Sequence, residues 1–160
     1  MPANHPFFME NQLIETWLIN DRINRYLLES IDEAHLGDQA GGKGRTVGEA
    51  LAHVHNVRLM WFKSADPELL GMVEKIEKEN ISKTRLMEQL EKSGKAMAAM
   101  LERGLAEGRI KGFKPHPVAF LGYITAHEAH HRGQIALALK LCGHPLDKKV
   151  GFGLWEWGTR

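Results

Sequence analysis

Hydrophobic side chains recur every three or four positions along most of the chain, a spacing typical of amphipathic α-helices. Helix-start signals agree with the pattern: Thr46 and Glu49 have the spacing of a capping box, Ser82 is a suitable N-cap, and Pro117 suits a first helical turn. Four long helices are predicted, at about 8–34, 47–64, 82–106 and 117–141. The predicted fold is all-α, an up-down-type four-helix bundle.

The segments between these helices interrupt the pattern. Four glycines within residues 37–44 predict a flexible connection, and residues 66–80, broken by Pro67 and Gly71, are predicted to be a loop. The tail at 151–158 is rich in aromatic residues and glycine, so we expect it to pack on the body of the protein, with its tryptophans covering the core. No repeat or linker divides the chain, and we predict a single domain over residues 1–160.

The composition and charge of the chain exclude several classes of function. Lys and Arg number 21 against 20 for Asp and Glu, a net charge of +1, which is too balanced for binding a nucleic-acid backbone. No apolar run is long enough to span a membrane, and the first residues lack the pattern of a signal peptide, so we expect a cytoplasmic protein with no membrane partner. Cys142 is the single cysteine, which excludes an internal disulfide and a thiolate-rich metal site. The nine histidines are the compositional clue to chemistry.

Two of these histidines lie on the apolar face of the last predicted helix. His131 is about 40° around the helix axis from His127, and Gln134 falls on the same face one turn later. Burying two imidazoles is costly unless both are bound, and a divalent cation would bind a nitrogen of each ring. Because such a pair also arises by chance, hydrogen bonds to neighbouring helices remain the alternative explanation.

A third histidine on a facing helix would complete a catalytic type of metal site, with three protein ligands and an open position. His53 is the best candidate, since it lies on the inward part of the second helix. His55 is turned about 200° away from it and is expected at the surface. His130 could replace His131, because it also lies one turn from His127.

Three segments resemble, in order along the chain, the DinB/YfiT-like family of metalloenzymes: Leu51–Arg58 and Ala126–Ile135, which contain histidines, and Gly153–Gly158. The resemblance implies a four-helix bundle, often a homodimer, with nickel or zinc on His53, His127 and His131. It also implies a low-molecular-weight thiol as cosubstrate. Cys142 lies about two turns beyond Gln134, so we do not expect its thiol to reach the metal. We therefore expect a metal-dependent transferase or hydrolase that acts on a small molecule.

Two other functions fit parts of the sequence. His127, Glu128 and His131 match the His-Glu-x-x-His pattern of zinc peptidases, in which Glu128 would be the general base, although no strand pattern accompanies it. Otherwise Glu128 is expected to be a carboxylate on the helix surface. A non-catalytic helical dimer stabilised by a metal is the third hypothesis.

Several polar residues could support the predicted site. Gln134 and Glu49 are candidates to accept the second ring N–H of a ligand histidine, and Asn56 and Tyr123 are candidates to line the pocket, although packing or capping explains each of them. Arg132 is expected to face a neighbouring helix or a dimer partner. The remaining histidines are expected to be exposed at helix ends and loops: His5, His35, His116 and His144.

Overall fold

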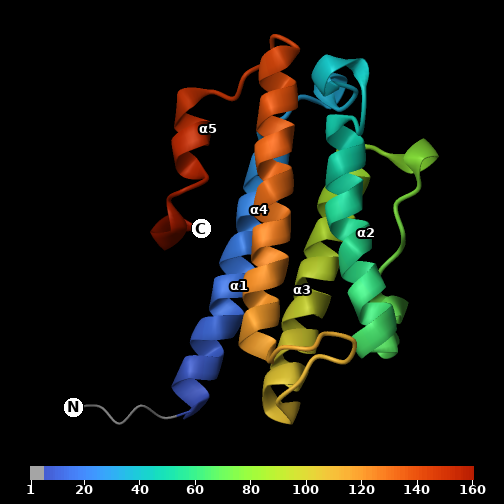
Figure 1. The fold of residues 1–160 in the computed structure, drawn as a ribbon. Helices are drawn as coiled ribbons and strands as arrows, with labels where there is room; N and C mark the ends of the chain where they lie inside the picture. Colours follow the sequence, from blue (N-terminus) through green and yellow to red (C-terminus); the bar gives the residue numbers. More distant parts are fainter. Residues whose placement is uncertain (1–5) are drawn as a thin grey trace.

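The computed structural model describes residues 6–160, and all of its regular secondary structure in that range is helical (Figure 1). Four long helices pack side by side: α1 (Pro6–Glu29), α2 (Val47–Ala65), α3 (Lys83–Glu107) and α4 (Pro117–Leu141). A short helix, α5 (Lys148–Gly153), follows, and 3-10 turns occupy the connections and the tail, at Glu33–His35, Ala40–Gly42, Pro67–Met72, Lys78–Asn80 and Trp157–Thr159. The predicted all-α class is confirmed. Among the described residues, none of the helices combines the length and hydropathy needed to cross a bilayer.

The directions of the long helices refine the up-down prediction. In Figure 1, α1 and α4 run one way and α2 and α3 run the other way. Residues 66–82 return along the outside of the bundle, so that α3 starts beside the end of α1, where Lys83 Nζ donates to the carbonyls of Glu29 (2.7 Å) and Ile31 (2.8 Å). The order is therefore up-down-down-up instead of strict alternation.

Local capping explains where the helices begin and end. The Thr46–Glu49 capping box is present at the start of α2, and the Ser82 side chain accepts from the amide of Arg85 at the start of α3. The first helix ends at Glu29, earlier than the predicted 34. There the Ser30 hydroxyl bonds a carbonyl of the preceding turn, and Asp32 caps a new 3-10 turn, so side-chain bonds compete with continuation of the helix.

A polar layer divides the core into two apolar clusters. One cluster contains Leu27, Leu51 and Leu90, and the other contains Trp17 and Phe62. Between them on the four long helices lie buried polar side chains: Asn20, Asp21, Asn24, Arg58, Ser93 and Glu128. The polar layer therefore crosses the bundle at the level of the α4 histidines.

The C-terminal tail contacts α1 through a few residues. The Arg160 guanidinium lies 3.6 Å from the centre of the Tyr26 ring, and Gly153 packs so closely on the same ring that a Cβ would overlap it. Trp155 is 81% exposed and Trp157 is half-buried, so the prediction that Trp155 covers the core is wrong. The backbone turns of 153–160 direct the Trp155 ring outward, which the composition of the tail does not reveal.

Candidate metal centre

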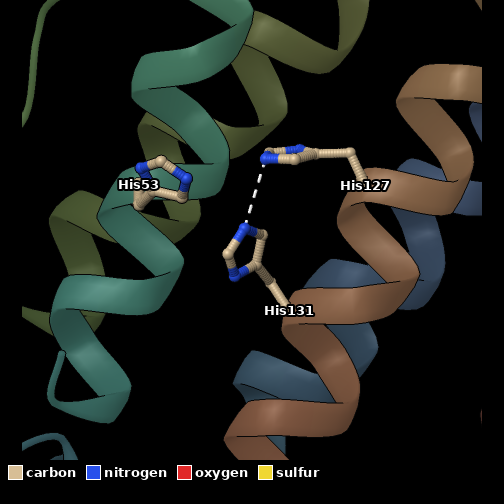
Figure 2. A group of neighbouring side chains, drawn as sticks. All are labelled: His53, His127 and His131. Atoms are coloured by element: carbon tan, nitrogen blue, oxygen red, sulfur yellow. Dashed lines mark hydrogen bonds between the residues drawn. The ribbon is translucent and has the colours of Figure 1, made fainter. Parts of the chain in front are cut away.

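Three histidine rings from two helices meet in the space between α2 and α4 (Figure 2). His53 comes from α2, and His127 and His131 come from successive turns of α4. The ring centroids are 4.6 Å apart for the α4 pair, and His53 is 4.7 Å from His131 and 5.5 Å from His127. One ring nitrogen of each residue lies within 4.8 Å of the others. The structure thus brings together the three histidines that the sequence analysis selected.

The two α4 rings present the same atom to each other. Nε2 of His131 lies 3.2 Å from Nε2 of His127 (Figure 2). Two nitrogen ligands of a tetrahedral ion, each at 2.0–2.1 Å from it, are about 3.3 Å apart. The spacing of this pair therefore suits joint binding of one cation.

Gln134 fixes the orientation of the His131 ring. Its Oε1 lies 2.9 Å from Nδ1 of His131, one turn along α4. An amide oxygen only accepts hydrogen bonds, so Nδ1 carries the proton and Nε2 keeps its lone pair. This tautomer directs the donor atom of His131 toward the other two rings.

Burial keeps the three rings neutral. It lowers the pKa of His53 to about 4 and also lowers the pKa values of His127 and His131. The positive charge of Arg45 acts in the same direction on all three rings. Neutral imidazole is the form that binds a metal, so the site is prepared for one at neutral pH. Nδ1 of His127 is buried and has no hydrogen-bond partner within residues 6–160.

Glu49 and Asn56 take part in contacts that hold the backbone in place. Glu49 completes the capping box of α2 and pairs with Lys78 at 2.8 Å, which explains the lowered pKa of its carboxyl group. The Asn56 amide pairs with both backbone groups of Ile76, at 2.9 and 3.0 Å, and so attaches the 66–82 segment to α2. Neither side chain forms a hydrogen bond with a histidine of the cluster.

Tyr123 lies one turn from His127 but belongs to an aromatic cluster. Its ring centroid is 5.4 to 6.1 Å from those of three aromatic side chains: Trp61, Phe113 and Phe120. The side chain is 44% exposed. Tyr123 therefore packs beside the site without bonding to it.

His55 is completely buried, so the prediction that it lies at the surface is wrong. Its Nδ1 lies 2.9 Å from the Ser93 hydroxyl and its Nε2 lies 2.7 Å from the carbonyl of Glu74. The error has a physical reason: the returning 66–82 segment covers the face of α2 that points away from α4. His130 is exposed on α4 and lies outside the three-histidine cluster.

Glu128 is also completely buried, which corrects the expectation of a surface carboxylate. Its Oε1 accepts from Arg58 Nε at 2.7 Å, and its Oε2 accepts from Arg58 Nη2 at 3.0 Å and from the amides of Asn20 (2.8 Å) and Asn24 (2.6 Å). Arg132 donates to the oxygens of the same two asparagines, so it faces α1. Both carboxylate oxygens are therefore engaged in this network.

Arg58 is the centre of the polar layer. Burial opposes its charge, but the carboxylates of Glu128 and Asp21, the latter at 2.9 Å, raise its pKa above the usual value. Burial in turn raises the pKa of Asp21. Gly94 on α3 leaves room for the Asp21 carboxylate, which a Cβ would overlap. In the sequence, Asn20 and Asn24 interrupt the apolar stripe of the first helix, and that interruption is the signal that points to this network.

Two hollows lie near the histidines, one with His53 in its wall and the other with Gln134, the partner of His131. One of about 340 Å³ lies between residues 40–50 and α4 and is lined by Arg45 and Gln134. Another of about 360 Å³ is lined by His53, Arg45 and the 75–81 segment. Both have the size of sites for small molecules.

Comparison with protein families identifies a match over most of the chain. The model of the DinB family matches residues 3–148, which include all three histidines of the cluster. No curated protein matches the chain. The matched range ends before the aromatic tail at 153–158, so the tail part of the resemblance noted from the sequence lies outside it.

Proposed function

The chain belongs to the DinB family, and on this basis we propose that it is a metal-dependent enzyme whose divalent ion is bound by His53, His127 and His131. The observation that carries the proposal is the convergence of three neutral ring nitrogens within 4.8 Å between two helices. Nickel and zinc are the proposed metals, since both accept imidazole ligands.

Three protein ligands leave a coordination position for another molecule. A bound divalent ion would supply a positive charge that lowers the pKa of a thiol and holds it as a thiolate nucleophile. The chain's own residues prepare this position. Gln134 orients the His131 ring, and burial lowers the pKa of this ring so that it stays neutral and able to bind a metal. Cys142 lies past the end of α4, where its thiol contacts the carbonyl of Gln39 at 3.5 Å, so the thiol must come from a cosubstrate.

We therefore propose a thiol-dependent S-transferase acting on a small molecule, with hydrolysis as the outcome if water replaces the thiol. The contacts of Glu128 argue against the peptidase alternative. A general base needs a free carboxylate oxygen, and both oxygens of Glu128 accept hydrogen bonds from Arg58 or the two asparagines of α1.

Metal analysis tests the proposal. Protein purified without an affinity tag is expected to contain about one divalent ion per chain, and His127→Ala is expected to lose it. His130→Ala is the matched control, because His130 is an exposed histidine on the same helix, and it should retain the metal. Equal metal contents in the two variants would contradict the assignment of ligands.

Cobalt substitution then separates an enzyme from a metal-stabilised bundle. An open position predicts that an added thiol produces a new sulfur-to-cobalt charge-transfer band. A non-catalytic site closed by four protein ligands predicts an unchanged spectrum, and that result would overturn the proposed activity while leaving metal binding intact.

A further inference from the structure

The 340 Å³ hollow lies beside the histidine cluster, with Gln134, the hydrogen-bond partner of His131, in its wall. Ala50 in its wall precedes His53 by one turn of α2, and Gln134 follows His131 by one turn of α4. Since α2 and α4 run in opposite directions, one turn back along α2 and one turn forward along α4 both lead toward the same end of the bundle (Figure 1). At 1.5 Å per residue, the hollow begins about 5 Å from the histidines along the bundle.

Only positive charge lines this hollow. Its charged side chains are Lys43 and Arg45, and no carboxylate is among the lining residues. Neither side chain forms a salt bridge with any residue of the described range, although twelve salt bridges occur there. The second hollow differs, because Glu49 and Glu77 offset the lysines beside His53. The basic hollow therefore offers two unpaired cationic groups to a ligand.

The charge of the metal site adds to this positive field. Three neutral imidazoles do not reduce the charge of a bound divalent ion, and the nearby carboxylate of Glu128 is already paired with Arg58. Arg45 lies close to the cluster, since it lines one hollow together with His53 and the other together with Gln134. Placing a guanidinium beside a cation is unfavourable unless an anion lies between or beside them.

We propose that Arg45 and Lys43 bind an oxyanion, a carboxylate or a phosphate, of a small molecule whose other end occupies the open metal position. The inference rests on the proposed metal site and adds the substrate class to it: the enzyme uses an anionic substrate or cosubstrate. A guanidinium binds carboxylate and phosphate oxygens with two parallel hydrogen bonds, and a lysine adds a point charge. The glycines flanking Lys43, of which Gly44 has a φ of 79°, set the backbone that presents both side chains.

Binding of matched thiols to the cobalt-loaded protein tests the proposal. The probes are ω-mercaptocarboxylates and ω-mercaptoalkylphosphonates of increasing length, each compared with the ω-mercaptoalcohol of equal length, and the readout is the charge-transfer band. The best anion is expected to bind about tenfold more tightly than its alcohol, which corresponds to about 1.4 kcal/mol. A clear optimum of chain length is expected as well, because the anion must reach Arg45. The better of the two anionic series identifies the oxyanion.

Variants show where the preference originates. Arg45→Gln combined with Lys43→Gln should bring the ratio of anion to alcohol affinity close to one and leave the alcohol affinity unchanged. Lys140→Gln is the matched control, because it removes a positive charge from an exposed position of α4 that does not line the hollow. It should preserve the ratio.

The outcomes distinguish this inference from the function it rests on. Failure to take up cobalt would overturn both. Cobalt uptake with equal affinity for anions and alcohols, or with a preference that Lys140→Gln weakens as much as the double variant does, would overturn the oxyanion site alone.

Discussion

At the scale of single residues, the histidines differ in what the sequence could reveal. The selection of His53, His127 and His131 depended on helical geometry, which is a local property. The burial of His55 depends on a contact with Glu74, 19 residues further along the chain, which no helical pattern on α2 predicts. Residues within one helix could therefore be placed, whereas contacts made by the connecting segments could not.

Because the His55 ring is buried, we expect the protein to lose stability in acid. Burial lowers its pKa to about 4 in the folded protein, whereas the unfolded chain has a value near 6.5. The unfolded state therefore binds protons first, so stability is complete above pH 6.5 and falls as pH drops toward 4. This difference corresponds to about 3 kcal/mol. Urea unfolding of wild type and His55→Gln at a series of pH values measures it.

The variant isolates this contribution from those of other acid-sensitive groups. His55→Gln should be less stable than wild type at neutral pH, because it disturbs buried hydrogen bonds, and the gap should narrow below pH 6. A gap that stays constant from pH 7 to pH 4.5 would contradict the assignment to His55.

At the scale of elements, capping and periodicity placed α2, α3 and α4 within about one residue of their observed bounds. These signals are contained in the sequence of each helix, as in Thr46 and Ser82. The end of α1 was misplaced because an apolar pattern continues through Ile31 after the helical backbone stops. The returning path of 66–82, and with it the shared direction of α2 and α3, depends on long-range packing.

The polar layer joins the four long helices, and Glu128→Gln tests its strength. The change removes the charge that offsets buried Arg58 and replaces one acceptor oxygen by a donor amide facing the guanidinium. Breaking a buried ion pair costs about 3–5 kcal/mol, so urea unfolding should show a loss of this order. Glu88→Gln is the control, since its ion pair with Lys92 is on the surface, and it should cost less than about 1 kcal/mol.

Metal content gives this prediction a second readout. Folded Glu128→Gln protein is expected to keep its metal, because Glu128 bonds α1 and α2 and not the histidines. Peptide cleavage by wild type that disappears in this variant would instead support the zinc-peptidase function.

At the scale of the whole molecule, the histidine cluster joins parts of the chain that the polar layer also joins. His53 and His127 are separated by 74 positions, and one ion would bridge α2 to α4 near the buried contact between Arg58 and Glu128. The two apolar clusters lie on either side of the polar layer, whose hydrogen bonds connect the helices at one level. The homodimer and the cytoplasmic location expected from the sequence stay predictions.

Removal of the metal should therefore lower the stability of the whole fold. A ligand present at about 100 times its Kd stabilises the native state by about 2.7 kcal/mol, and for a chain of this size each kcal/mol shifts Tm by about 2–4 °C. Chelation is expected to lower the Tm of wild type by about 5–10 °C, and added nickel or zinc should restore it. His127→Ala should show the lower Tm without chelator and no response to either treatment, whereas His130→Ala should behave as wild type. A Tm of wild type that chelation leaves unchanged, in protein shown to lose its metal, would mean that the ion does not link α2 to α4.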